Sequence, residues 1–526
     1  HVDLYVTNFG SNVLYHNNGN GTFSDVSLQA GVANARWGTS CAFADLDQDG
    51  FLDLYVANYA DYAIDRDRRC EVRGIWQYCG PRAYPPAADV LYHNNGNGTF
   101  TDRSRESGIL IEPAGHSLGL ACGDYDKDGY LDLYIANDQE VNLLWRNQTE
   151  GRFENAALLA GVGYSDLGLE ESGMGTAFGD YDNDGHLDLY VCNFVQFDYW
   201  KDFPPPRAGS PCKLKGIPIA CPPDMYKGEQ DLLYRNKGDG TFQDISYRSG
   251  FALSESGAEQ AGMGIAVGDF DNDGGVDFYI SNFSDDYNTL YRNEGEGFFV
   301  DATFRYGLAR PTIPFLGWGT GFLDFDNDGF KDLFVANGHS YPGVDQYNWG
   351  TSWAQRPLLF QNLAGKRFKE VPPLAGSGLS VVVPARGAAF GDLNNDGAVD
   401  VVMNCVDGSP KVLINRAGSS NNWILLRLIG TEKSPSDAIG TTVFLTADGK
   451  RQRGDVISGG SYASHSDLRL HFGLGSAEQV EKVEIRWASG KTSTVADLPV
   501  NRIITIQEGE PEPVVTTTGQ DSKRDG

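Results

Sequence analysis

Six stretches of the chain place aspartate or asparagine at alternating positions before a glycine, a spacing that could bind a hard divalent cation. Side-chain oxygens fall at positions 1, 3, 5 and 9 of each stretch, and glycine stands at position 6. A tight loop of this kind points several oxygens at one ion, and the backbone carbonyl of position 7 adds another. Calcium accepts such irregular oxygen coordination, whereas magnesium retains water and requires octahedral geometry. The predicted calcium ligands are Asp45, Asp47, Asp49, Phe51, Asp53, Asp124, Asp126, Asp128, Tyr130, Asp132, Asp180, Asp182, Asp184, His186, Asp188, Asp269, Asp271, Asp273, Gly275, Asp277, Asp324, Asp326, Asp328, Phe330, Asp332, Asp392, Asn394, Asp396, Ala398, Asp400 and, in an incomplete loop, Asp3.

Six loops in register favour metal binding far more than one loop would. A single acidic turn is weak evidence, because Asp and Gly favour turns of every kind. An EF-hand is excluded because position 12 of the first loop is Val56 rather than glutamate, and the flanking residues lack helical periodicity. The last loop has the neutral Asn394 at position 3, so we expect it to bind more weakly. We predict six calcium ions with a structural role, and a seventh if the partial loop at Asp3 is completed.

Each acidic loop lies at the tip of a predicted hairpin. A stretch of small residues precedes the loop and an alternating strand follows it, as at 52–58. A second motif, Leu-Tyr-x-Asn or a close variant, follows each hairpin, for example at 91–94, and in the better copies continues through a Gly-containing turn into a short strand. Each repeat therefore predicts four short strands, and seven such repeats are typical of a seven-bladed β-propeller. We predict an all-β fold with this propeller over residues 1–416.

The repeat pattern stops near residue 421. Strands predicted at 423–428, 441–445, 468–472 and 483–487 indicate a small, sandwich-like β-domain over residues 417–510. Residues 511–526 are predicted to be a flexible tail. The chain opens at position 7 of a loop, so we expect preceding residues to complete the first repeat. Residues 521–526, placed before His1, would nearly recreate that loop, and we interpret this as coincidence.

These motifs resemble known families. The acidic loops and the Leu-Tyr-x-Asn turns resemble the FG-GAP or VCBS repeats of integrin α chains and many bacterial secreted proteins. Residues 459–464, 471–475 and 483–490 resemble the ASPIC/UnbV domain. The combination is similar to the family of cartilage acidic protein and its bacterial relatives, and it covers nearly the whole chain. The resemblance implies a secreted, calcium-binding propeller.

The net charge limits the classes of partner. A formal charge of −29 argues against nucleic-acid binding, which needs clustered Lys and Arg. The loop aspartates and Asp3 supply 24 of the 71 acidic side chains, so six divalent ions would bring the charge from −29 to about −17. No apolar run is long enough to span a bilayer.

The eight cysteines fall into two groups. Cys70 and Cys79 enclose eight residues, as do Cys212 and Cys221, and both pairs lie in Pro-rich insertions. We predict two local disulfides formed in an oxidising compartment. Zinc binding is the alternative, although a CxxC spacing is lacking. The other four cysteines lie in or beside apolar strands and are predicted to be small buried side chains. We therefore expect an extracellular, periplasmic or cell-surface protein.

Three insertions lengthen the repeats, at 59–89, 194–231 and 338–357. Equivalent connections of a propeller emerge on one face, so we expect the insertions to cluster there and to offer a surface to a protein or glycan partner. The alternative is that they cap the propeller and pack on one another. Their aromatic residues are Trp76, Tyr84, Trp200, Tyr226, Tyr347, Trp349 and Trp353.

Motifs for catalysis are sparse. His116, His186 and His339 are isolated, and no zinc-protease motif, nucleophile elbow or phosphate loop occurs. The leading prediction is a binding or structural module of open oligomeric state. The alternatives are an extracellular enzyme of lyase or hydrolase type with its active site at the propeller channel, and a subunit of an extracellular filament or complex. The residues expected at the mouth of the channel, of which one is polar, are Leu118, Met174, Met263, Trp318 and Arg386.

Overall fold

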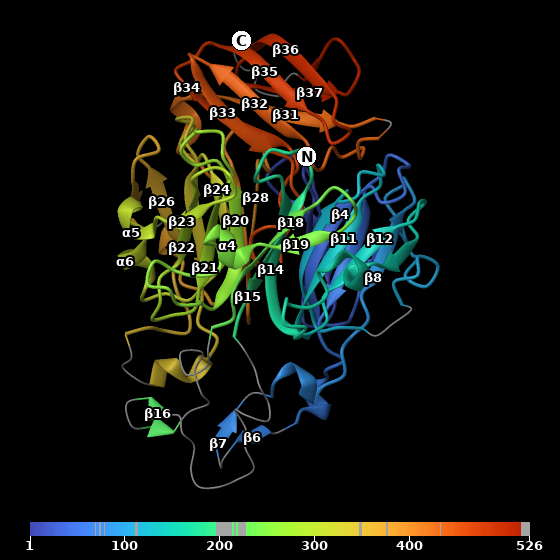
Figure 1. Ribbon diagram of the computed structural model, residues 1–526, viewed down its shortest axis with the longest axis vertical. Helices are drawn as coiled ribbons and strands as arrows, with labels where there is room; N and C mark the ends of the chain where they lie inside the picture. The colour runs from blue at the N-terminus through green and yellow to red at the C-terminus, as the bar shows by residue number, and fades with distance from the viewer. Residues whose placement is uncertain are drawn as a thin grey trace.

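The computed structural model describes the chain except residues 69, 73–74, 78, 111–113, 196–212, 215–216, 219–227, 347–349, 375–376, 432 and 517–526. Of the short strands at 70–72, 75–77, 213–214 and 217–218 only the backbone is described. Antiparallel strands dominate, so the predicted all-β fold is confirmed. Figure 1 shows the repeats side by side, with the C-terminal sheets at one end and β6, β7 and β16 at the other.

Seven consecutive units, here called units 1 to 7, follow the sequence repeats. Four strands were predicted for every unit, but units 1 and 7 have three and the others four. After β30 of unit 7 the described chain continues into the C-terminal sheets without a fourth strand. Pairing of β11 with β14 joins units 3 and 4. The strands, unit by unit, are β1 (Leu4–Val6), β2 (Val13–Asn17) and β3 (Phe23–Asp25); β4 (Gly38–Ala44), β5 (Asp53–Asn58), β8 (Val90–Asn94) and β9 (Phe100–Asp102); β10 (Ser117–Gly123), β11 (Asp132–Glu140), β12 (Leu143–Asn147) and β13 (Phe153–Asn155); β14 (Glu171–Gly179), β15 (Asp188–Asn193), β18 (Leu232–Asn236) and β19 (Phe242–Asp244); β20 (Gly262–Gly268), β21 (Asp277–Asn282), β22 (Thr289–Asn293) and β23 (Phe299–Asp301); β24 (Gly317–Leu323), β25 (Asp332–Asn337), β26 (Leu358–Asn362) and β27 (Phe368–Glu370); β28 (Ala385–Gly391), β29 (Asp400–Cys405) and β30 (Lys411–Leu413).

Short helices and hairpins connect the strands. The α-helices are single turns on the described chain, and the insertions carry short hairpins. These elements are α1 (Ser27–Ala30), α2 (Ala157–Ala160), α4 (Ser246–Ser249), α5 (Thr303–Tyr306), α6 (Ala309–Thr312), the 3-10 turns η1 (Ile64–Arg66), η2 (Pro81–Ala83), η4 (Pro342–Gln346), η5 (Gly378–Ser380) and η6 (Gly418–Ser420), and the strands β6 (Cys70–Val72), β7 (Ile75–Gln77), β16 (Lys213–Leu214) and β17 (Ile217–Pro218).

The asparagine of the Leu-Tyr-x-Asn motif holds neighbouring units together. Its side-chain amide donates to the backbone carbonyl of position 2 in the acidic loop of the preceding unit, as Asn147 does to Leu46 at 2.8 Å. The same bond recurs in units 4 to 7. Asn17 of unit 1 donates to Leu393 of unit 7 at 2.9 Å and so closes the series into a ring. The motif is therefore the joint between the units of a β-propeller.

The innermost strands use glycine because they approach one another closely around the axis. A Cβ on Gly119 would lie 2.1 Å from the carbonyl oxygen of Met174 in the next unit. A Cβ on Gly264 would lie 2.3 Å from the carbonyl oxygen of Trp318. Side chains at these positions would force the units apart, which explains the small-residue stretches before each loop.

The C-terminal sheets form a sandwich beyond the ring. Its first sheet has the order β34-β31-β37-β38 and its second the order β33-β32-β35-β36, and a buried apolar core that includes Leu426, Val443 and Ile485 lies between them. The predicted strands at 423–428, 441–445, 468–472 and 483–487 correspond to β31, β32, β34 and β35. The strands are β31 (Asn422–Ile429), β32 (Thr442–Ala447), β33 (Lys450–Asp455), β34 (Leu470–Gly475), β35 (Gln479–Arg486), β36 (Thr492–Pro499), β37 (Arg502–Gln507) and β38 (Val514–Thr516).

The second insertion, 194–231, falls largely outside the described residues, whereas most of the other two is described. The side chains of Trp76, Trp200, Tyr226, Tyr347 and Trp349 are among those outside. Tyr84 packs edge-on against Tyr62, with ring centroids 5.0 Å apart. Each predicted disulfide includes at least one cysteine side chain outside the described set, so Cys70–Cys79 and Cys212–Cys221 stay predictions. Cys41, Cys122, Cys192 and Cys405 are free, the second and third buried and the others half-buried. No helix among the described residues is long and apolar enough to cross a membrane.

Candidate metal centre

Each acidic loop is folded by its own carboxylates. In unit 2 the carboxylate of Asp45 accepts the N–H of Asp49 at 3.1 Å and of Gly50 at 3.0 Å. The carboxylate of Asp49 accepts the N–H of Phe51 at 2.9 Å. Gly50 has φ 89°, a left-handed conformation that glycine adopts without steric cost. Position 6 has positive φ in every complete loop, which explains its invariant glycine.

The aspartate at position 9 ties the loop to the third strand of its unit. Asp277 of unit 5 accepts the N–H of Asn293 at 2.8 Å and the N–H of Phe270 at 3.3 Å, and it is fully buried. The corresponding bond to the third-strand asparagine recurs in the other six units. The asparagine therefore makes two connecting hydrogen bonds, one from its backbone N–H to its own loop and one from its side-chain amide to the loop of the preceding unit.

The predicted ligands converge. In units 2, 4 and 5 the carboxylates of positions 1, 3 and 5 offer oxygens that all lie within 4.8 Å of one another, and in unit 3 those of positions 1, 3 and 9 do. At position 7 the predicted ligand is the backbone carbonyl, so the prediction does not involve the ring of His186. The backbone N–H of His186 donates to Asp184 at 2.9 Å. In unit 7 the amide of Asn394 donates to Asp396 at 3.0 Å, so one potential ligand already occupies an oxygen of another. The acidic clusters are able to hold metal ions.

Burial makes these carboxylates costly without a cation. Burial is the largest cause that raises the pKa of Asp269 to about 6; the charge of Lys331 opposes this rise, and the charges of neighbouring loop carboxylates add to it. In the same way burial raises the pKa of Asp124 to about 7 and that of Asp324 to about 8. Four loops also contain a buried carboxylate oxygen with no hydrogen-bond donor: Asp47 Oδ1, Asp180 Oδ1, Asp269 Oδ1 and Asp326 Oδ1. A divalent cation would satisfy these oxygens, so the residues present fit the predicted ion.

The residue before the third-strand asparagine faces the loop, which sequence reasoning missed. Arg292 of unit 5 donates to Asp271 at 2.8 Å and to Asp273 at 2.6 Å. Arg146 and Arg235 make similar pairs in units 3 and 4, and Gln361 makes a neutral one in unit 6. The recurrent basic residue at position x of Leu-Tyr-x-Asn was the available signal.

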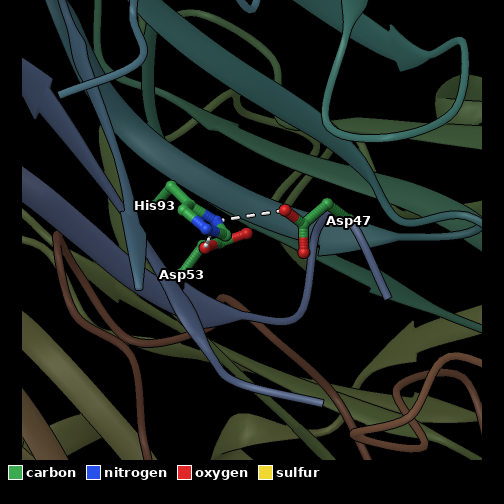
Figure 2. A group of neighbouring side chains, drawn as sticks. All are labelled: Asp47, Asp53 and His93. Atoms are coloured by element: carbon green, nitrogen blue, oxygen red, sulfur yellow. Dashed lines mark hydrogen bonds and ion pairs between the residues drawn. The ribbon is translucent and has the colours of Figure 1, made fainter. Parts of the chain in front are cut away.

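Units 1 and 2 differ because a histidine occupies this place, His16 in the first and His93 in the second. Figure 2 shows His93 between Asp47 and Asp53, with Nδ1 at 3.0 Å and 3.2 Å from their carboxylate oxygens. Both His93 and Asp47 expose 15% of the side chain. His16 makes the corresponding contact to Asp3 in unit 1, at 3.1 Å.

Comparison with known proteins agrees with this geometry. FG-GAP-like repeats match residues 1–56, 80–135, 124–191, 269–335 and 324–403, more than half of the chain. The chain belongs to the FG-GAP-like repeat family. Its C-terminal residues 430–513 match the ASPIC and UnbV domain. The resemblance predicted from the motifs is therefore confirmed.

Several relatives of this FG-GAP protein are similar over most of its length. Cartilage acidic protein 1 of Xenopus tropicalis is 24% identical over 494 residues, which make up 90% of this chain and 65% of the relative. Cartilage acidic protein 1 of Mus musculus is 22% identical over 520 residues, 88% of this chain and 73% of the relative. The chain thus spans about two thirds of the length of the frog relative. Among solved structures, an Agrocybe aegerita lectin with specific recognition of non-reducing terminal N-acetylglucosamine aligns with a TM-score of 0.42 and 16% identity, covering 80% of this chain and 92% of that one.

The ASPIC/UnbV domain lies on the loop end of the FG-GAP propeller, as Figure 1 shows for β31 to β37. The Ser436 hydroxyl donates to the carboxylate of Asp45 in unit 2, and the N–H of Asp45 donates to Asp437 at 3.2 Å. Two units further round the ring, His471 Nε2 lies 3.0 Å from the carbonyl oxygen of Gly397 in unit 7. The domain therefore contacts the loops directly.

A segment of the ASPIC/UnbV domain, residues 457–466, enters the centre of the FG-GAP propeller; we call it the plug. Gly460 donates to the carbonyl of Thr176 in unit 4 at 2.8 Å, and Ser461 exchanges backbone hydrogen bonds with Ile265 in unit 5, at 2.5 and 2.9 Å. The Ser461 hydroxyl donates to the carbonyl of Ala388 in unit 7 at 2.7 Å. The Tyr462 ring packs against Trp318 in unit 6, with centroids 4.8 Å apart. The plug thus contacts the innermost strands of four units.

The residues predicted for the channel mouth surround this plug without forming an acid–base pair. Arg386, the polar member, donates to the carbonyls of Gly338, Ala385 and His339 and packs 4.4 Å from the ring of Trp318. Burial lowers the pKa of His339 to about 4, and its ring packs between Phe283 and Tyr341. Leu118, Met174 and Met263 are buried in one apolar cluster with Trp318.

A cavity of about 1220 Å³ lies between units 1 and 7 under the ASPIC/UnbV domain. Its lining includes β1, β28 and residues 463–469 of the chain. Two serines there could serve a nucleophilic role, but Ser464 donates to the carbonyl of Tyr462 at 2.8 Å and Ser466 accepts the N–H of Phe390 at 3.2 Å. Neither of these two hydroxyls has a recorded bond to the neighbouring His465, whose Nε2 is buried without a partner. His116, the remaining histidine considered for catalysis, lies in unit 3 with its Nδ1 3.2 Å from a carboxylate oxygen of Glu140.

Proposed function

We propose that this FG-GAP protein is a calcium-stabilised β-propeller that acts as a binding or structural module outside the cytoplasm. The observation that carries the proposal is the convergence of carboxylates in successive loops, four of which contain a buried carboxylate oxygen without a donor. A bound calcium ion would supply the positive charge that these oxygens lack. Positions 1, 3, 5 and 9 would hold it through carboxylates, and position 7 through its carbonyl.

The role proposed for the ions is structural. Position 9 joins each loop to the third strand, and the third-strand asparagine joins it to the preceding unit, so an ordered loop supports two units at once. Extracellular calcium modules have dissociation constants of roughly 10⁻⁴ to 10⁻³ M, which match a millimolar-calcium environment. Each site at a free calcium concentration equal to its dissociation constant would stabilise the fold by about 0.4 kcal/mol.

Calorimetric titration of chelator-treated protein tests this role. We expect calcium to bind at up to six sites, with the loop that contains Asn394 the weakest, and magnesium to bind less tightly at the same concentrations. Thermal unfolding should move to higher temperature with calcium and return with EDTA. An unfolding temperature that is the same in calcium and EDTA would contradict the proposed structural role.

Two observations support a module rather than an enzyme. The plug fills the centre of the ring where propeller active sites would lie, and Arg386 at the mouth is committed to backbone carbonyls. Ser464 and Ser466, near the neighbouring cavity, are bonded to the backbone rather than to His465. Crystals soaked with candidate substrates would decide the question, since a ligand bound between acid and base groups in the channel would favour the enzyme.

The partner and the compartment are part of the same proposal. We assign a protein or glycan partner to the insertion end of the propeller, opposite the ASPIC/UnbV domain (Figure 1). Against this, Tyr62 packs on both Tyr84 and Trp37, with centroids 5.0 and 5.8 Å apart, which favours mutual packing for that part of the insertions. Glycan-array and size-exclusion measurements with and without calcium would distinguish a ligand-binding module from a filament subunit.

The calcium loops and the two cysteine pairs support an extracellular, periplasmic or cell-surface site. The name of the relatives, cartilage acidic protein 1, is consistent with this proposal. Mass measurement with and without a reductant and a thiol reagent would test whether Cys70–Cys79 and Cys212–Cys221 are formed.

A further inference from the structure

Two arginine–aspartate pairs stand at the two ends of the plug, in mirror order. On the N-terminal side the pair is Arg453 and Asp455, with guanidinium–carboxylate contacts of 2.9 Å. On the C-terminal side it is Asp467 and Arg469, with a contact of 2.6 Å. The side chain of Arg453 is 0% exposed although it lies on the surface of its own sandwich, because the propeller covers it.

Both arginines bind the same two groups of an acidic loop. Arg453 donates to the backbone carbonyl of Asp180, position 1 of the unit 4 loop, at 3.1 Å and to the amide oxygen of Asn183, position 4, at 2.9 Å. Arg469 donates to the backbone carbonyl of Asp392, position 1 of the unit 7 loop, at 2.8 Å and to the amide oxygen of Asn395, position 4, at 2.8 Å. The two contacts are therefore equivalent in loops on different sides of the ring.

Arg453 also joins neighbouring loops. It donates to the carbonyl of Gly274, position 6 of the unit 5 loop, at 3.0 Å. In other units a side chain at position 4 makes this bond to the next loop directly, as Asn272 does to Gly329 at 2.9 Å and Asn327 to Gly397 at 3.0 Å. Between units 4 and 5 the arginine is inserted into the series.

We propose that these two pairs are clamps that hold the plug in the channel only while the loops of units 4 and 7 are closed around calcium. This inference rests on the proposed function, because it requires calcium in those loops. The carbonyl of position 1 belongs to the residue whose carboxylate would bind the ion, and position 4 lies between ligands at positions 3 and 5. Opening of the loop therefore moves both acceptors away from the guanidinium.

The aspartate of each clamp offsets the charge of its arginine. The pair has no net formal charge and binds the loop through backbone and amide oxygens, although the Arg453 guanidinium still attracts the nearby Asp180 carboxylate. Without a cation, three carboxylates in the unit 4 loop, two half-buried and one exposed, offer oxygens within 4.8 Å of one another, and their repulsion favours an open loop. Calcium and the clamped plug therefore stabilise the same loop conformation.

Hydrogen–deuterium exchange on the full chain tests the coupling. The amides of Gly460 and Ser461 report on the plug, because both donate to inner strands of the propeller. At a temperature where the protein stays folded in EDTA, we expect these amides to exchange at least tenfold faster in EDTA than in calcium. Amides of β31 and β37, within the ASPIC/UnbV sandwich, should change much less.

A double variant separates the clamp from the metal. R453M with D455N removes the clamp and its counter-charge together, while Asp269 remains as a carboxylate near the buried Lys331. We expect the plug amides of this variant to exchange fast even in calcium. Because coupling between two binding events is reciprocal, the variant should also bind calcium several-fold more weakly at one or two sites. R451A is the matched control, since Arg451 lies on the same strand with half of its side chain exposed. The pair R469M with D467N provides a second test if the first variant does not fold.

The outcomes are distinguishable. Equal protection of the plug in calcium and EDTA, in a protein that calorimetry shows to bind calcium, would overturn the clamp proposal and leave the proposed function standing. Absence of calcium binding would overturn both. Fast exchange in EDTA together with slow exchange in R453M/D455N with calcium would show that the plug responds to the metal by a route other than Arg453, and it would overturn the role of this clamp.

Discussion

Replacement of Asp269 by asparagine should raise the stability of the calcium-free protein and reduce the stabilisation that calcium provides. Asp269 is 1% exposed; its Oδ2 accepts the N–H of Gly274 at 3.0 Å, and its Oδ1 has no donor. Asparagine has the same shape and keeps an acceptor for Gly274, but it carries no charge. In EDTA the variant should be more stable than the native protein, and calcium should stabilise it less.

The magnitude follows from the pKa of Asp269. Burial raises this pKa from 3.8 to about 6, so its folded-state value lies above its unfolded-state value. The contribution of Asp269 to stability is fully present below pH 3.8 and is lost as the pH rises through 6. At pH 7 the loss corresponds to about two pKa units, or roughly 3 kcal/mol at 1.36 kcal/mol per unit. The asparagine variant avoids this cost, so its advantage in EDTA should approach about 3 kcal/mol.

Calcium should remove that advantage. At a free concentration of 100 times the dissociation constant, one site stabilises the folded state by about 2.7 kcal/mol, which the variant forfeits in its unit 5 loop. The two proteins should then have nearly equal stability in calcium. With an unfolding entropy of about 2.1 cal/mol/K per residue, 3 kcal/mol in a domain of this size corresponds to roughly 3–4 °C.

Differential scanning calorimetry of both proteins in EDTA and in calcium measures all four values. The expected pattern is a higher unfolding temperature for D269N in EDTA and a smaller increase on addition of calcium. An asparagine variant that is less stable than the native protein in EDTA would show that Asp269 has a favourable contact without metal. Equal calcium-induced increases would show that this loop does not bind the ion.

Three further substitutions test neighbouring parts of the argument. N394D should lower stability in EDTA and enlarge the calcium-induced increase in unfolding temperature, since it completes the weakest loop. R292Q should copy the neutral arrangement of Gln361 and, by removing a cation from the loop, tighten calcium binding several-fold in a calorimetric titration. Burial first and then the charge of Glu229 raise the pKa of Glu171 to about 9, so ionisation of Glu171 should lower stability by about 1.4 kcal/mol per pH unit between pH 5 and 9. E171Q should remove this contribution and leave that of Asp231, whose pKa burial raises to about 8, when unfolding is followed in saturating calcium at several pH values.

The sequence was sufficient to predict the repeated parts of the fold, because each local pattern occurs several times in the same setting. The strand predicted at 52–58 is β5, Asp53–Asn58, and its length is set by the loop before it and the asparagine at its end. The convergence of the loop carboxylates could be predicted for the same reason, since positions 1 to 9 are adjacent in the chain. Contacts of short sequence separation are encoded in local spacing.

The seating of the C-terminal domain could not be predicted in this way. Arg453 and Asp180 are separated by 273 residues, and nothing near either residue names the other as its partner. Position x of Leu-Tyr-x-Asn was also missed, because it contacts a loop that is 20 residues away in unit 3 but 51 residues away in unit 4. Insertions change that separation without changing the geometry, so no fixed spacing marks the pair.

The plug constrains which surfaces of this propeller could act on a partner. Backbone bonds from residues 460 and 461 to the inner strands of units 4 and 5 cannot be lost by a change of side chain alone, and the two arginine–aspartate pairs hold both ends of the segment on the loops. A ligand that approaches the channel from the loop end would have to displace the ASPIC/UnbV domain as a whole. A ligand that approaches from the insertion end meets Trp318 and Arg386. The ring of Tyr462 already packs against Trp318, and Arg386 already donates to backbone carbonyls. Recognition is therefore more consistent with the outer rim and the insertions than with the axis, unless loss of calcium releases the plug.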